Sequence, residues 1–168
     1  DADGIVTVDL SAGAAQDAAG NDNTAATQFS FTSDQSAPSV TLSTAVTSPT
    51  NAAVIAVNIA FSKSVTGLDL GELTVGNGTA INLTGSGTAY SIDITPAADG
   101  LVTIDIAAGV AQDATGNDNT AATQLSITSD RTAPLVTVEI TGTSKGSPSV
   151  TGTLDDENAT ISVSINSM

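Results

Sequence analysis

The sequence predicts an all-β protein made of small β-sandwich domains, and three observations carry that prediction. Apolar and polar residues alternate in short runs, and no stretch of useful length follows a helical period. Clusters of glycine and asparagine separate these runs and supply the conformations that tight turns need. The chain also repeats itself at an offset of 96 residues, which is close to the length of one small sandwich domain.

About seven short strands are expected in residues 35–130, each with one apolar face. Tight turns are expected at residues 76–78, 85–87 and 99–100, which contain glycine. In chain order, the apolar positions that mark the strands are Val40 and Leu42, then Ile55, Val57, Ile59 and Phe61, then Ile81 and Leu83, then Tyr90, Ile92 and Ile94, then Val102, Ile104 and Ile106, and last Leu125 and Ile127.

The internal repeat predicts the domain organisation. Residues 1–42 align with residues 97–138, and 29 of the 42 aligned positions are identical. One complete copy therefore occupies residues 35–130, and residues 1–34 correspond to the C-terminal part of a preceding copy. Residues 131–168 correspond to the N-terminal part of a following domain. We predict immunoglobulin-like β-sandwich repeats in tandem.

The connectors between these parts are short and contain proline. Pro38 and Pro134 occupy the same position of the repeat, and each fixes its own φ angle and holds the residue before it in an extended conformation. We expect neighbouring repeats of the same chain to abut through these connectors.

Composition excludes several classes of function. The chain has 18 acidic and 3 basic residues, and its net charge is −15, so neither nucleic acid nor an anionic membrane is an expected partner. It has no cysteine and no histidine, which excludes thiol and imidazole catalysis. Only four residues are aromatic, too few for a sugar-cleaving site. We expect neither an enzyme nor a segment that inserts into a membrane.

Two nearly identical acidic loops are the candidate metal sites. The sequence DATGNDN at residues 113–119 has its counterpart, DAAGNDN, at residues 17–23. Ca²⁺ prefers six to eight oxygen ligands from carboxylates and carbonyls, and such loops offer several. We predict a Ca²⁺ ion between Asp34 of the connector and the 113–119 loop. The candidate ligands are Asp17, Asn21, Asp22, Asn23, Asp34, Asp113, Asn117, Asp118, Asn119 and Asp130.

An ordinary turn is the alternative interpretation of both loops. Aspartate, asparagine and glycine are common in turns because they accept local hydrogen bonds or adopt positive φ. The ligand spacing of an EF-hand is absent. The sequence leaves the metal site and the ordinary turn open.

Four segments resemble the bacterial immunoglobulin-like repeats of large surface adhesins and biofilm-associated proteins. They are FSKSVTG at residues 61–67, TPAADG at residues 95–100, the loop at residues 113–119, and TAP at residues 132–134. The resemblance implies a structural extender, or spacer, on the bacterial cell surface, often with calcium at its domain junctions. It implies an extracellular location and a role in cell adhesion.

Two further expectations concern partners. The alternative function is a ligand-binding adhesion module that contacts a carbohydrate or a protein. In addition, the incomplete parts at residues 1–34 and 131–168 offer strand edges that could associate head to tail between molecules.

Overall fold

The computed structural model describes residues 3–141, 149–155, 159, 160 and 162. The chain divides into two compact units, Asp1–Asp130 and Arg131–Met168. Apart from one short 3₁₀ helix, the elements of the described part are β-strands, which confirms the predicted all-β class. None of its helices has the length and apolar character required to span a bilayer.

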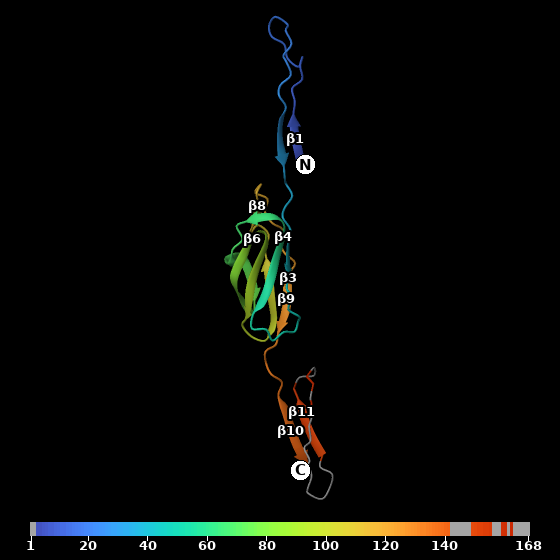
Figure 1. The fold of residues 1–168 in the computed structure, drawn as a ribbon, viewed down its shortest axis with the longest axis vertical. Helices are drawn as coiled ribbons and strands as arrows, with labels where there is room; N and C mark the ends of the chain where they lie inside the picture. The colour runs from blue at the N-terminus through green and yellow to red at the C-terminus, as the bar shows by residue number, and fades with distance from the viewer. Residues whose placement is uncertain (1–2, 142–148, 156–158, 161, 163–168) are drawn as a thin grey trace. The chain divides into compact units, whose positions relative to one another are not determined.

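The first unit contains nine strands (Figure 1). They are β1 (Gly4–Val8), β2 (Phe29–Ser33), β3 (Val40–Ser43), β4 (Ile55–Thr66), β5 (Leu73–Gly76), β6 (Gly78–Pro96), β7 (Gly100–Ile106), β8 (Gln112–Asp113) and β9 (Leu125–Ser129). The 3₁₀ helix η1 (Leu70–Glu72) precedes β5. The second unit contains β10 (Val136–Thr141) and β11 (Ser149–Leu154).

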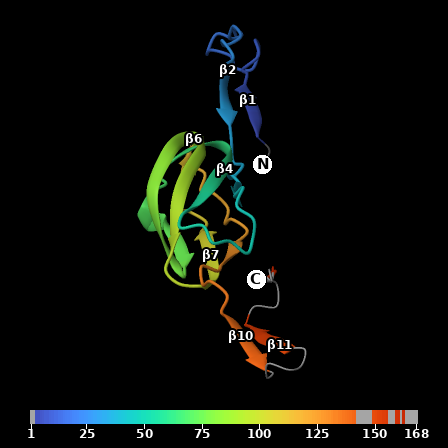
Figure 2. The same cartoon turned by 60° about the horizontal axis from the view of Figure 1, so that its bottom comes forward.

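Strands β3 to β9 form two antiparallel sheets that pack face to face. One sheet has the order β3-β4-β6, with β8 also paired to β4, and the other has the order β5-β7-β9. Figure 2 shows β4 and β6 in one layer and β7 in the other. This is the sandwich that the sequence predicts, and alternate residues of each strand point into it.

The core lies between the two layers and consists mainly of isoleucine and valine. Fully burying one such side chain contributes about 1.5–3 kcal/mol to folding, so these rows of branched residues are the main source of stability. The buried apolar residues are Val40, Ile55, Val57, Ile59, Phe61, Val65, Leu68, Ile92, Ile94, Val102, Ile104, Ile106, Ala111 and Ile127.

The long strand β6 doubles back on itself. The Thr84 and Ser91 hydroxyls are 2.9 Å apart, and the amide of Asn82 donates to Asp93. Gly85 has a φ of 102°, and a Cβ atom there would meet the carbonyl oxygen of Ala89 at 2.3 Å. The glycine predicted for this turn is therefore required both by the backbone conformation and by the close approach of the two arms.

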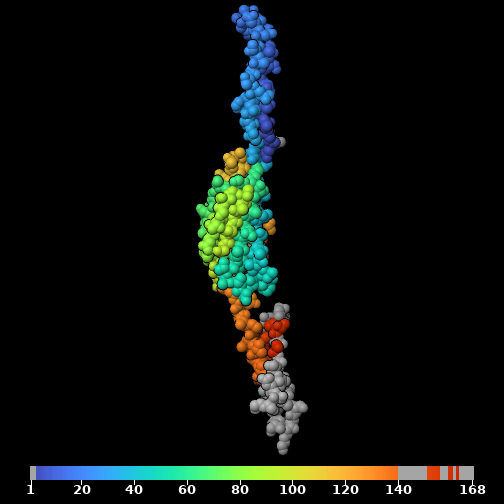
Figure 3. Space-filling model, in the orientation of Figure 1, coloured from blue at the N-terminus to red at the C-terminus, as the bar shows by residue number. Residues whose placement is uncertain are grey.

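The hairpin β1–β2 has the same strand register as the pair β7–β9. Val6 pairs with Phe31 in the hairpin, as Val102 pairs with Ile127 in the sandwich. All residues of β1 are exposed, and the hairpin forms a two-stranded sheet of its own. In Figure 3 the hairpin is the narrow blue segment of the molecule.

In the second unit, β10 and β11 pair antiparallel from Val136 opposite Leu154 to Thr141 opposite Ser149. The backbone N–H of Leu135 donates to the Asp155 carboxylate at 2.7 Å. Much of the predicted domain start at residues 131–168 lies outside the described residues. The boundaries 1–34, 35–130 and 131–168 stay predictions.

Candidate functional site

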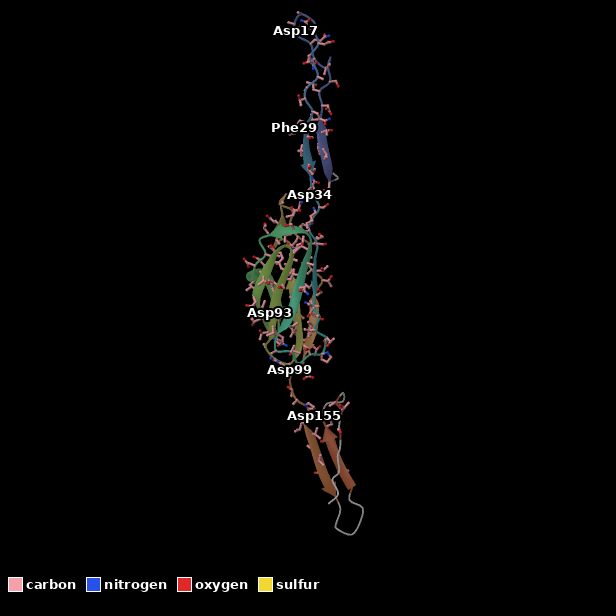
Figure 4. The ribbon with its side chains drawn as sticks, viewed as in Figure 1. Asp17, Phe29, Asp34, Asp93, Asp99 and Asp155 are labelled. Atoms are coloured by element: carbon pink, nitrogen blue, oxygen red, sulfur yellow. The ribbon has the colours of Figure 1, made fainter. Side chains whose placement is uncertain are left out.

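The candidate site lies where the connector after β2 meets the 113–119 loop of the sandwich. Asp34 immediately follows β2 (Figure 4). The side-chain amide of Asn117 donates to the Asp34 carbonyl oxygen at 3.1 Å, although the two residues are 83 positions apart. The structure therefore brings Asp34 and the 113–119 loop together, whereas the calcium ion between them stays a prediction.

Asp113 organises the loop through its own carboxylate. One of its oxygens, Oδ1, accepts from the backbone N–H groups of Thr115 at 2.9 Å and Asn117 at 3.0 Å. The side-chain amide of Asn117 donates to the other oxygen, Oδ2, at 3.0 Å. Aspartate folds locally in this way because its short side chain reaches amides two to four residues ahead, and Gly116, with a φ of 87°, completes the turn.

These hydrogen bonds also set the ionisation of Asp113. Its pKa lies well below the usual range, because the Asn117 side chain, the Thr115 hydroxyl and two backbone N–H groups all stabilise the charged form. The side chain is only 5% exposed. Asp113 is thus a buried, permanently charged anchor of the loop at neutral pH.

Asn119 is buried, and its side chain forms hydrogen bonds with backbone groups on both sides of the loop. Its Oδ1 accepts from the N–H groups of Val110 at 3.0 Å and Ala111 at 2.8 Å. Its side-chain amide donates to the carbonyl oxygens of Ala107 and Thr120. The oxygen of Asn119 is therefore fully used by the fold.

Lys63 places its ammonium group between the connector and the loop. Its Nζ lies 2.6 Å from Asp34 Oδ1 and 3.5 Å from Asp113 Oδ2, and it donates to the carbonyl oxygen of Ser36 at 2.6 Å. The hydrogen bond with Asp34 raises the pKa of Lys63 above its usual value, so the group is charged.

The connector itself is bonded on two sides. The Asp3 carboxylate of the hairpin accepts from the backbone N–H of Gln35 at 2.7 Å and from the Ser36 hydroxyl, and these bonds lower the pKa of Asp3. On the other side, the N–H of Thr120 donates to the Pro38 carbonyl oxygen at 2.9 Å. Pro38 is buried.

Several of the predicted calcium ligands already have other partners in this arrangement, and calcium at this junction stays a prediction. The part of the chain that the structure describes contains no group of three acidic side chains placed to hold a metal ion, although Ca²⁺ also accepts amide and backbone carbonyl oxygens. The Asn119 oxygen is committed to the backbone, and the Lys63 ammonium already lies between the Asp34 and Asp113 carboxylates. Asp118 is exposed and accepts from Gln112 at 2.8 Å.

The 17–23 loop repeats the same hydrogen bonds in the hairpin. Asp17 accepts from the N–H groups of Ala19 and Asn21, and the Asn21 side chain is the main cause of its lowered pKa. Asn23 accepts from Ala15, and Asp22 accepts from Gln16.

At the other connector, the backbone N–H of Asp130 donates to the Thr50 carbonyl oxygen at 2.8 Å. The assignment of Asp130 as a calcium ligand stays a prediction.

Sequence reasoning missed Lys63 as part of this site. It is one of only three basic residues in a chain with 18 acidic ones, and it lies in the FSKSVTG segment that carries the family resemblance. A scarce cation among many anions was the available signal, because such a group finds carboxylate partners easily.

A family model described as a bacterial Ig-like domain matches residues 34–129, which is more than half of the chain. Searches of the curated proteins and of the solved structures gave no match.

Proposed function

The chain belongs to the bacterial Ig-like domain family, and from that premise we propose that it is a structural extender module of a large bacterial cell-surface adhesin. Domains of this family are typically not enzymes and are commonly extracellular. In this role the module has no reaction to perform. Its task is to hold neighbouring parts of one chain at a fixed spacing.

The connection between hairpin and sandwich carries this proposal. Residues 34–38 are hydrogen-bonded to the Asp3 carboxylate on one side and to the Asn117 and Thr120 groups on the other. A flexible linker would leave these backbone groups to water. A bonded, proline-containing connector restricts the angle between neighbouring segments, and that restriction is what a spacer requires.

Lys63 supplies the charge at this connection. The loop and the connector each bring a carboxylate, and two carboxylates brought together without a cation repel each other. The ammonium group between Asp34 and Asp113 removes that repulsion and ties the connector to the sandwich. Lys63 and Asp34 are each about 30% exposed, so solvent screens part of this attraction.

Spin-label distance measurements test the proposal directly. The chain has no cysteine, so the double variant Thr7→Cys, Asn58→Cys places one label on the hairpin and one on the exposed face of β4. We expect a narrow distance distribution in the parent chain and a broader one after Lys63→Met. Lys63→Arg should keep the distribution narrow, because it keeps the charge.

A distribution that is already broad in the parent chain would contradict the spacer proposal itself. A narrow distribution that Lys63→Met leaves unchanged would keep the spacer but remove Lys63 from its support. Calcium at the same junction stays a prediction, and binding there would require the ammonium group to leave the two carboxylates.

The alternative of a ligand-binding module has less support from the sandwich. Phe61 is 5% exposed and packs edge to face against Tyr90, with ring centroids 5.9 Å apart. The Tyr90 hydroxyl donates to the Val65 carbonyl oxygen. Both aromatic residues of the sandwich thus serve its core.

A further inference from the structure

The hairpin β1–β2 presents an uncovered apolar face. Val6, Val8, Phe29 and Phe31 are 39%, 58%, 62% and 50% exposed, and they form cross-strand pairs on one face of the hairpin. The two phenylalanine rings lie against each other, with centroids 6.1 Å apart. Apolar side chains gathered in this way mark a surface that another protein segment covers.

The strand pair β7–β9 repeats the register of β1–β2, and in this second pair the apolar face is covered by the other sheet of the sandwich. Val102 and Ile104 of β7 and Ile127 of β9 occupy the positions of Val6, Val8 and Phe31, and they are 0%, 0% and 2% exposed. The opposite, outer face of each hairpin is exposed in both copies.

Ile5 and its counterpart Leu101 are 75% and 58% exposed, so both copies leave the outer face open. The two hairpins therefore differ mainly on the face that points into the sandwich. What distinguishes them is the layer that covers this face in the second copy.

The cover of the second copy is the half-domain formed by residues 35–96. Strands β4 and β6 place Ile55, Val57, Ile59, Ile92 and Ile94 in the same core as the inner face of β7 and β9. Strand β5 pairs with the outer edge of β7, from Leu73 opposite Ile106 to Gly76 opposite Thr103. In the hairpin, the corresponding edge of β1 belongs to a sheet of only two strands.

We propose that the inner face of β1–β2 is a docking surface for a polypeptide half-domain built like residues 35–96. Such a partner covers Val6, Val8, Phe29 and Phe31 with a sheet equivalent to β4 and β6. Its equivalent of β5 pairs with the free edge of β1 by strand addition. This inference concerns the hairpin face and stands independently of the connector at Asp34.

The size of Phe29 and Phe31 restricts which half-domains can pack against this face. At the positions of Phe29 and Phe31, the sandwich has Leu125 and Ile127. A larger side chain in a closely packed core forces its neighbours apart, so a sheet that fits the smaller pair does not fit the phenylalanines equally well. The partner of the hairpin must provide more room at these two positions, and this limits the exchange of hairpins between similar repeats.

The test joins a second copy of residues 35–96 directly ahead of Asp1, as Pro96 precedes Ala97, and keeps the full chain behind it. Hydrogen exchange followed by mass spectrometry then compares residues 4–10 and 29–33 with those of the parent chain. We expect their amides to exchange at least ~10-fold more slowly in the extended chain, because a covered hairpin must open before it exchanges.

Matched substitutions distinguish docking on the inner face from a nonspecific slowing of amide exchange in the hairpin. Val8→Asp on the inner face should abolish the protection, whereas Ile5→Asp on the outer face should preserve it. Phe29→Leu with Phe31→Ile should raise the melting midpoint of the added domain by roughly 4 °C or more, because the face then matches the sheet of residues 35–96.

Unchanged exchange in the extended chain would overturn the docking surface. So would a parent chain that sediments as a dimer in which β1–β2 and β7–β9 are both protected, because the hairpin of a second copy, and not its residues 35–96, would then be the occupant. A midpoint that the double phenylalanine substitution lowers would overturn the selective role of these residues.

Discussion

At the scale of single residues, Asp113 shows how one side chain can have a structural role and still resemble a metal ligand. The oxygens that the sequence offered to calcium accept hydrogen bonds from Thr115 and Asn117 and face the Lys63 ammonium. A carboxylate that accepts several hydrogen bonds is held in its charged form. The same chemistry that suits a cation therefore suits a tight loop.

The depressed pKa of Asp113 predicts how stability depends on acid. An aspartate that titrates lower in the folded state than its unfolded value of about 3.9 stabilises the fold fully above that value, and the contribution fades as pH falls toward the folded pKa. We expect the melting midpoint of the sandwich to fall steadily below about pH 4.

Asp113→Asn should lower the midpoint at pH 7 and flatten its fall between about pH 4 and 2, because the variant lacks the titrating charge. Asp118→Asn removes a similar charge from an exposed position of the same loop and serves as the control. Thermal melts of the three proteins across this range check the prediction. Equal acid sensitivity in the parent chain and Asp113→Asn would assign the effect to other carboxylates.

At the scale of elements, the same hairpin sequence has two different environments. The pair β7–β9 lies in a sandwich, whereas β1–β2 forms a sheet of two strands. A two-stranded hairpin is only marginally stable in water, even with good turn residues. Register and loop geometry follow from local sequence, but stability follows from the covering layer.

This difference predicts where a protease cuts first. Chymotrypsin cleaves after aromatic residues, and Phe29 and Phe31 are exposed whereas Phe61 is buried and Tyr90 is half-buried. We expect limited digestion to cut after Phe29 and Phe31 and to leave the sandwich intact, because cleavage requires local opening that the hairpin permits easily. Mass spectrometry of the fragments checks this order. Early cleavage after Phe61 or Tyr90 would show that the sandwich opens as readily as the hairpin.

At the scale of the whole molecule, the large negative net charge is the main electrostatic influence on stability. With 18 acidic and 3 basic residues, the compact state carries a net charge of −15, and self-repulsion opposes folding. Added salt screens this repulsion, because the Debye length falls from about 30 Å at 0.01 M to about 10 Å at 0.1 M ionic strength. Three basic residues cannot neutralise 18 acidic ones, so screening should stabilise the protein even though it weakens the Lys63 contacts.

Thermal melts in CaCl₂ and NaCl at equal ionic strength separate screening from calcium binding. If Lys63 supplies the cation of the junction, both salts should raise the midpoint equally, and EDTA should change nothing further. A specific ion at 100 times its dissociation constant would add about 2.7 kcal/mol. An extra rise of several degrees in calcium, lost in EDTA and in the Asp34→Ala, Asp113→Ala variant, would establish the calcium clamp instead.

The sequence by itself determined the all-β class, most of the alternating core residues and the position of the turns, although Ile81, expected on the apolar face of a strand, is 39% exposed. These features are local, because a period of two and a glycine at positive φ act within a few residues. It also placed Asp34 near the 113–119 loop, since a sandwich returns its loops to the end where the chain enters.

Only the tertiary structure decided what that proximity means. Lys63 meets Asp34 and Asp113 from a strand distant from both in sequence, and the buried Asn119 gives its oxygen to the backbone. The same is true of Phe29 and Phe31, whose alternation predicts burial but whose covering layer must come from elsewhere. A charge partner and a covering sheet are supplied by residues far along the chain, so no local pattern can specify them.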